Sequence, residues 1–207
     1  MELIVLKLGV HNDIYPKKPE ENVDHYINPI CGAAVLIKGE KNIIVDTGNI
    51  GFKDEILKEL LKHGLKADEI DYVINTHTHF DHCSNNYLFT KAKRICGINV
   101  WGEKDAINYK DPEKIAVSGV KIITTPGHRP EHTSVVAEVD GKTYVVAGDA
   151  IEEKNILEKK YESRVTRKEI YDSIKKILKI ADVIIPGHGP IIEGKRLEQL
   201  RKAAQED

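Results

Sequence analysis

Residues 72–82 read YVINTHTHFDH and place four metal-ligating side chains within six residues, directly after an apolar run. The four are His77, His79, Asp81 and His82. Because side chains alternate along an extended segment, the two imidazoles of the His-x-His pair point the same way. The next acid and histidine fall just past the following bend and can serve a second ion. This stretch therefore predicts a site that can hold two metal ions.

Three further candidate ligands follow, each near a turn or at the end of an apolar run. They are His128 in Thr125-Pro126-Gly127-His128, Asp149 in Val146-Ala147-Gly148-Asp149, and His188 in Pro186-Gly187-His188-Gly189. Imidazoles and carboxylates without a thiolate suit Zn(II), and they also suit Fe(II) and Mn(II). Seven such ligands are typical of a two-metal centre in which one carboxylate is shared. The sequence predicts two divalent ions, with zinc favoured.

In this pattern the chain resembles the metallo-β-lactamase fold superfamily. The His-x-His-x-Asp-His signature at residues 77–82 is followed, in the family's order, by a distal histidine (His128), a bridging acid (Asp149) and a final histidine (His188). Residues 45–48, Val-Asp-Thr-Gly, also look like the family motif whose acid, here Asp46, buttresses the site. The likeness spans about residues 1–192, and residues 145–149 and 182–190 look most like small single-domain metallo-β-lactamase-domain-containing proteins.

The resemblance implies an α/β (α+β) fold, a four-layer αββα sandwich of two mixed β-sheets flanked by helices. The predicted strands are residues 2–8, 33–38, 42–46, 71–75, 93–98, 120–125, 133–139, 143–147 and 182–185. Helices are predicted over residues 53–63, from a capping box of Thr166 and Glu169 to Ala181, and over residues 194–205. Lys38 to Lys41 predicts a turn, and Asp140-Gly141 predicts a hairpin. Every predicted ligand falls at a strand end or in the loop that follows it.

Composition predicts one domain over residues 1–207, since 207 residues with 41% hydrophobic and 31% charged residues suit one folded unit. The formal charge of −2 gives no bulk attraction to nucleic acid or to an anionic membrane.

No apolar run approaches bilayer length or resembles a signal peptide, so a cytoplasmic location and no membrane partner are expected. Three cysteines without Cys-x-x-Cys spacing predict reduced thiols. The Ile, Lys and Glu bias is of the kind seen in hyperthermophiles.

The chemistry expected of such a centre is hydrolysis by a hydroxide that bridges the two ions. One ion would be held by His77, His79 and His128 and the other by Asp81, His82 and His188, with Asp149 shared between them. Bound cations lower the pKa of water and accept the oxyanion that forms on attack. Asp81 would orient the hydroxide, so Asp81 and Asp149 are the predicted catalytic residues. The leaving group's proton donor is not identifiable from the sequence.

Several residues near these motifs have two readings. His132 either braces its loop or donates a hydrogen bond near the substrate, and we favour the brace. His11 and His25 fall in a polar stretch, residues 11–30, that is either a lid over the metals or an ordered surface loop; surface histidines are the simpler reading. Cys83 follows His82 but is not included among the ligands. His63 is interpreted as a cation at the C-terminus of a helix, and Glu131 as a residue that changes the charge of the substrate pocket. The walls of that pocket are expected to come from residues 11–30 and 150–165, including Tyr161.

The lengths of two segments of the chain exclude several branches of the superfamily. Only 19 residues follow His188, too few for the glutathione-binding extension of glyoxalase II, and only 38 separate Asp149 from His188, too few for a β-CASP insertion. The acid-substituted cassette and flavodoxin domain of flavodiiron proteins are also missing. The leading hypothesis is a hydrolase of a small ester, thioester or lactone, with a small molecule as its partner.

Three alternatives remain. A phosphodiesterase or ribonuclease is one, because residues 152–179 hold nine Lys or Arg against six acids, so RNA is a second candidate partner. An iron-dependent sulfur dioxygenase with one metal is another. A non-catalytic binding protein ranks last because no ligand is lost. The oligomeric state is not predicted.

Overall fold

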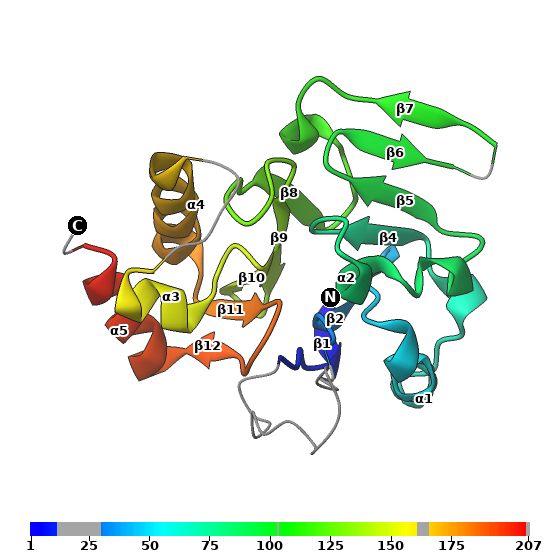
Figure 1. Cartoon of the computed structure of the whole chain (residues 1–207). Coiled ribbons are helices and arrows are strands. Elements are labelled where there is room, and N and C mark those ends of the chain that lie inside the picture. Colours follow the sequence, from blue (N-terminus) through cyan, green and yellow to red (C-terminus); the bar gives the residue numbers. More distant parts are fainter. Residues whose placement is uncertain (12–29, 103, 161–165, 206–207) are drawn as a thin grey trace, which may run out of the picture.

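The structure, a computed structural model, describes residues 1–11, 30–102, 104–160 and 166–205. Within these ranges one sheet runs in the order β1 (Glu2–Lys7), β2 (Ala34–Lys38), β3 (Asn42–Val45), β4 (Tyr72–Asn75), β5 (Lys93–Cys96), β6 (Asn99–Trp101) and β7 (Ala106–Asn108). β1 to β3 are antiparallel, β3 to β5 parallel and β5 to β7 antiparallel. The predicted antiparallel start of the chain is confirmed, and the sheet is mixed (Figure 1).

The second sheet has the order β12 (Ile192–Glu193), β11 (Val183–Pro186), β10 (Lys142–Gly148), β9 (Thr133–Val139) and β8 (Val120–Thr124). β9 and β10 form the predicted hairpin, in which Asp140 and Gly141 have φ of 50° and 76°. Two consecutive positive φ values match the twist of a tight antiparallel hairpin, which is why Asp-Gly marks it in the sequence. β10 and β11 are parallel and are joined through α4 (Arg167–Ile180).

Helices cover the outer face of each sheet. α1 (Lys53–Lys62) packs on the first sheet, and α3 (Glu153–Glu158), α4 and α5 (Gly194–Ala203) pack on the second. The remaining short helices are α2 (Phe80–Cys83), η2 (Ile50–Phe52), η3 (Ala67–Glu69), η4 (Asn86–Leu88) and η5 (Pro112–Lys114). α4 begins with the predicted capping box, in which Thr166 Oγ1 accepts from the Glu169 amide and Glu169 accepts from the Thr166 amide. No helix in the described ranges has the length and apolar character needed to cross a membrane.

Side chains alternate between the two faces of each strand and so contribute to the apolar cores on both sides of a sheet. In β2, Val35 and Ile37 belong to the apolar core between the sheets, whereas Leu36 belongs to the core under α1. In β10, Val146 faces the other sheet and Val145 packs under the helices of the second. Strands buried on both faces are nearly continuous apolar runs, which explains the Val- and Ile-rich composition of these segments. Three apolar cores separate four layers, so the predicted αββα sandwich is confirmed.

The sequence predictions differ from the structure mainly in short elements. Residues 93–98 do not form one strand: β5 ends at Cys96, and Gly97, with φ of 53°, turns the chain into β6. β6, β7, β12 and α3 were not predicted, because segments of two to six residues carry little periodicity. The predicted lid at residues 11–30 falls almost wholly outside the described residues, as do His25 and Tyr161.

Candidate metal centre

The six-residue cassette leaves the end of β4 and turns directly into a short helix. His77 and His79 lie before the turn, their ring centroids 4.6 Å apart, and His79 is the residue that precedes α2. Asp81 and His82 lie inside this first helical turn and are buried. The bend predicted between the two halves of the cassette is therefore the start of α2. It separates the side chains into two groups.

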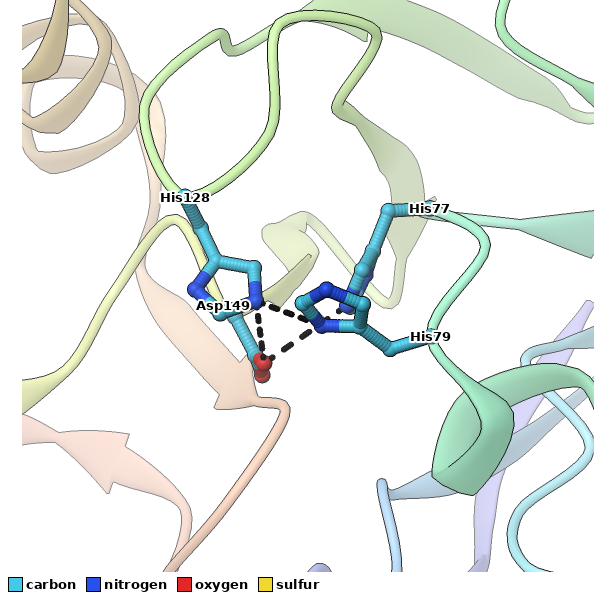
Figure 2. A group of neighbouring side chains, drawn as sticks. All are labelled: His77, His79, His128 and Asp149. Atoms are coloured by element: carbon cyan, nitrogen blue, oxygen red, sulfur yellow. Dashed lines mark hydrogen bonds and ion pairs between the residues drawn. The ribbon is translucent and has the colours of Figure 1, made fainter. Parts of the chain in front are cut away.

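The first group consists of His77, His79, His128 and Asp149, whose ligand atoms all lie within 4.8 Å of one another. His128 arrives from the loop after β8, and Asp149 follows β10. Nε2 of His128 lies 2.8 Å from Nδ1 of His79 and 3.3 Å from Oδ2 of Asp149. Nε2 of His77 lies 3.7 Å from the same oxygen. Figure 2 shows the three imidazoles and the carboxylate converging, with His77 and His79 on one segment and His128 and Asp149 each on another.

The second group consists of Asp81, His82 and His188. Oδ2 of Asp81 lies 3.3 Å from Nε2 of His188 and 3.5 Å from Nε2 of His82. The other oxygen of Asp149, Oδ1, lies 3.3 Å from Nε2 of His82 and 3.6 Å from Nε2 of His188. Asp149 therefore presents one carboxylate oxygen to each group, the arrangement that a shared ligand requires. The structure brings all seven predicted ligands together in the predicted division.

Asp46 supports both groups from the end of β3. Its carboxylate accepts hydrogen bonds from the amide and the hydroxyl of Thr76, each at 2.8 Å, and its Oδ2 lies 2.8 Å from Nδ1 of His82. The Thr76 hydroxyl is in turn 3.0 Å from Nδ1 of His77. With each Nδ1 protonated, Nε2 of His77 carries a free lone pair, and Nε2 of His82 carries one once its proton has been lost. This arrangement fixes the tautomer that a metal ligand needs.

Two other histidines are held through the main chain or through side-chain hydroxyls. Nδ1 of His188 donates to the carbonyl of Val10 at 3.1 Å, which leaves its Nε2 directed at the two carboxylates. His132 is fully buried, its Nδ1 is 2.9 Å from the Thr125 hydroxyl, and its ring stacks on His77. Because His132 belongs to neither ligand group, its position agrees with a brace for the loop.

Unsatisfied polar atoms test whether metal ions fit here. Six buried side-chain atoms have no hydrogen-bond partner among the described residues: Asn85 Oδ1, His132 Nε2, His77 Nε2, His82 Nε2, Asp81 Oδ2 and Asp149 Oδ1. Buried polar groups are normally satisfied, and one that is not costs roughly 1–3 kcal/mol. Four of these six atoms, those of His77, His82, Asp81 and Asp149, belong to the two ligand groups. Their imidazole nitrogens and carboxylate oxygens suit borderline and hard divalent cations. The residues present therefore fit two divalent cations.

Electrostatics differ between the groups. Burial lowers the pKa of His77, His79 and His128, so these imidazoles are neutral and ready to ligate. Burial opposes protonation of His82 and His188 as well, but the nearby carboxylates outweigh it. The pKa of His82 is raised well above its ordinary value by Asp149 and Asp46, and that of His188 is raised to about 9 by Asp149 and Asp81. A cation in the second group would replace these protons.

A cleft of about 340 Å³ opens onto both groups. Its wall includes five of the predicted ligands, His79, Asp81, His128, Asp149 and His188. Ile30, Glu153 and Lys154 come from the two segments predicted to form the pocket walls, residues 11–30 and 150–165, whereas Pro186, Ile192 and Arg196 lie outside them. His11 also lies in this wall, its ring centroid 5.3 Å from that of His188. The reading of His11 as a surface residue is therefore incomplete, because it is exposed but lies at the cleft. Nothing in the sequence marks the α5 residue Arg196, since only packing brings it here.

Two other residues lie outside the ligand groups. Cys83 Sγ lies 3.6 Å from the carbonyl of Thr78 and belongs to neither group. The carboxylate of Glu131 accepts from Thr78 Oγ1 at 3.3 Å and from Arg129 Nε at 3.1 Å. Glu131 is not among the residues that line the cleft, so its predicted effect on the charge of the pocket is not seen. It links the two loops that carry the histidines of the first group.

The chain is similar to several known proteins in sequence and in fold. A family model described as the metallo-beta-lactamase superfamily matches residues 31–188. A protein described as a probable metallo-hydrolase from Methanocaldococcus jannaschii is 37% identical over 157 residues, 75% of this chain and 74% of that protein. Metallo-beta-lactamase domain-containing protein 1 of Xenopus laevis is 33% identical over 165 residues, covering 77% and 71%. A metallo-beta-lactamase family protein from Thermus thermophilus has a similar fold, with a TM-score of 0.64, 20% identity and coverage of 99% and 79%.

Proposed function

The chain belongs to the metallo-beta-lactamase superfamily, and from that premise we propose that it is a metal-dependent hydrolase with two cations at its centre. The observation that carries the proposal is the position of Asp149, whose two oxygens reach the two ligand groups separately. The relative from Methanocaldococcus jannaschii, described as a probable metallo-hydrolase, supports hydrolysis as the reaction class. The open cleft beside both groups supports a substrate that reaches them directly.

In the proposed site His77, His79 and His128 would hold one cation, and Asp81, His82 and His188 would hold the other. Asp149 would be shared between them. Two bound cations supply a lowered pKa for water and positive charge for the oxyanion of the transition state. Zn(II) is the cation we favour, since imidazole and carboxylate ligands suit it.

The chain's own groups prepare the site for this chemistry. Asp46 and Thr76 hold the imidazoles of His77 and His82 in one tautomer, so neither ring needs to reorient when a cation binds. Asp81 lines the cleft with a carboxylate that can accept a hydrogen bond from the attacking water and set its direction. Water enters the acyl group as the C–O or C–S bond breaks, and the leaving group takes a proton.

We propose a small ester, thioester or lactone as the substrate. The volume of the cleft is at the lower end of the range for ligand pockets, about 300–1,000 Å³. The cleft therefore suits a small molecule better than an extended polymer. RNA cleavage and oxidation of a sulfur compound remain as the alternatives that an experiment must separate.

The test is a substrate panel run on protein whose metal content has been measured. Protein with about two zinc ions per chain should hydrolyse generic esters, lactones or thioesters, lose activity in a chelator and recover it when Zn(II) is restored. Bis(p-nitrophenyl) phosphate and RNA test the phosphodiesterase alternative, for which binding should weaken steeply with salt. One iron per chain with oxygen uptake would support the dioxygenase instead. Metal-loaded protein inactive on every acyl substrate would overturn the proposal.

A further inference from the structure

The cleft that reaches the metal ligands also contains one fixed arginine, Arg196 on α5. We propose that Arg196 selects substrates that carry a carboxylate at a distance from the bond to be hydrolysed. The inference rests on the proposed function, because it names the substrate class of the same site. It assigns the substrate as a small ester, thioester or lactone with an anionic end.

Arg196 is held in one orientation by Glu153 of α3. Nε of the guanidinium donates to Oε1 of Glu153 at 2.6 Å, and Nη2 donates to Oε2. Two parallel hydrogen bonds fix the plane of the guanidinium group, so the side chain loses less conformational freedom when a further ligand binds. Within the described residues no partner other than Glu153 is recorded for Arg196, so Nη1 keeps its donors for a ligand.

The pair is partly shielded from solvent. The side chain of Arg196 is 36% exposed and that of Glu153 is 25% exposed. Charge-assisted hydrogen bonds strengthen where water is partly excluded, so a carboxylate that reaches Nη1 is bound more firmly than at an open surface. The same side chains line the cleft, which places Arg196 within reach of a molecule seated there.

Apolar groups form other parts of the same wall. Ile30, Pro186, Pro190 and Ile192 line the cleft together with the ligand residues and Arg196. A short alkyl chain suits these surfaces and can join a carbonyl at the metal ligands to an anionic end at Arg196. A long uncharged chain would exclude water from Nη1 and leave its N–H donors without a hydrogen-bond partner.

Charge in the cleft favours an anion over a cation. Both oxygens of Glu153 are engaged by Arg196, so the carboxylate of Glu153 is paired. The carboxylate of Glu152 accepts from the Asn155 amide at 2.5 Å and lies 3.8 Å from Nδ1 of His128. Two divalent cations together with Arg196 would outweigh the four acids of the wall, Asp81, Asp149, Glu152 and Glu153. The loaded cleft is therefore positive, which attracts an anionic substrate.

The experiment compares p-nitrophenyl hexanoate with the mono-p-nitrophenyl ester of adipic acid, in which a carboxylate replaces the terminal methyl group. We expect kcat/KM of the zinc-loaded protein to be higher for the adipate ester, after subtraction of hydrolysis without protein. Arg196→Gln should lower the ratio of the two kcat/KM values by about tenfold or more, mainly through KM. Arg196→Lys should restore part of it. Free adipate should inhibit turnover of the hexanoate ester, with an inhibition constant that rises about tenfold in Arg196→Gln.

Two variants control for charge and for stability. Lys195→Gln makes the same charge change on an exposed residue of α5 outside the cleft wall and should leave the ratio unchanged. Glu153→Gln weakens the link between α3 and α5 but keeps the arginine, so it should lower the ratio by less than about threefold. Equal losses in Glu153→Gln and Arg196→Gln would mean that Arg196 only holds α3 to α5, and would overturn the inference.

The remaining outcomes separate the two proposals. If both esters are hydrolysed in a zinc-dependent way with a ratio that Arg196→Gln does not change, the inference fails and the proposed function stands. If the zinc-loaded protein hydrolyses neither of these esters nor any other acyl substrate of the panel, the proposed function fails and the inference fails with it.

Discussion

Asp46 Oδ2 lies 2.8 Å from Nδ1 of His82, although the two residues are 36 positions apart in the chain. Asp46 has φ of 53°, a left-handed conformation that is unusual outside glycine but is tolerated by Asp and Asn. This conformation turns the carboxylate back from the end of β3 toward Thr76 and His82. A strained main-chain position is thus used to orient two predicted ligands at once.

Asp46→Asn tests this relationship with little change to the main chain, since Asn also adopts the left-handed region. The amide can accept from Thr76 or from His82 with its one oxygen, but its NH₂ group faces the other donor. We expect affinity for Zn(II) to fall about 10- to 100-fold. Competition with a chromophoric chelator measures this. An unchanged affinity would show that Asp46 does not orient the ligands.

Asp149→Ala tests the shared ligand. Removing the carboxylate takes one oxygen from each group, so the variant should lose at least one metal ion and nearly all hydrolytic activity. Elemental analysis and the ester panel are the measurements. Asp172→Ala, which removes an acid paired with Lys168 on the exposed face of α4, is the matched control. Full metal content and full rate in Asp149→Ala would contradict its assignment.

Metal uptake should release protons from the second group but not from the first. Without metal, His188 has a pKa of about 9 and that of His82 is also raised, so both are protonated at neutral pH. Binding of a cation there should release about two protons per chain, whereas His77, His79 and His128 have none to release. Calorimetric titrations in buffers of different ionisation enthalpy count these protons. Heats that do not depend on the buffer would contradict the charge states.

The sequence predicted the ligands better than the cleft, for a physical reason. His77, His79, Asp81 and His82 are adjacent in the chain, and strand ends that meet at one edge of a sandwich explain why turn-held residues such as His188 join them. The cleft depends on which side chains helix packing brings to that edge. Arg196 reaches it only because α5 packs beside α3, and no local pattern reports that contact.

Glu113→Gln tests a stabilising contact far from the ligands. Burial would raise the pKa of Glu113, but hydrogen bonds from Lys176 and Thr124 outweigh it and lower the pKa to about 2 from 4.5. A lowered pKa stabilises the fold above pH 4.5, and this contribution is lost as the pH falls toward 2. The variant should lose about 1 kcal/mol of unfolding free energy at neutral pH.

Denaturant unfolding of both proteins across that pH range is the measurement. The difference between wild type and Glu113→Gln should shrink as the pH falls from 4.5 to 2. A difference that stays constant with pH would show that the charge of Glu113 contributes nothing.

Gly187→Ala tests the close approach of the β11 loop to the shared carboxylate. A Cβ at this position would collide with Oδ1 of Asp149 and come within 2.9 Å of Cε1 of His82. The carboxylate must move, so metal affinity should fall about tenfold or more while the fold is retained. Gly51→Ala, where the nearest atom is 3.9 Å away, is the control. Equal metal affinity in both variants would show that the carboxylate position is not important.

The most direct test of the central claim is a crystal structure of zinc-loaded protein with anomalous diffraction recorded at the zinc edge. We predict two anomalous peaks on either side of Asp149. One should lie about 2.0–2.1 Å from Nε2 of His77, Nδ1 of His79 and Nε2 of His128, and the other at similar distances from Asp81, His82 and His188. The account would be contradicted if protein never exposed to a chelator showed no peak at these residues and still bound no zinc there after reconstitution.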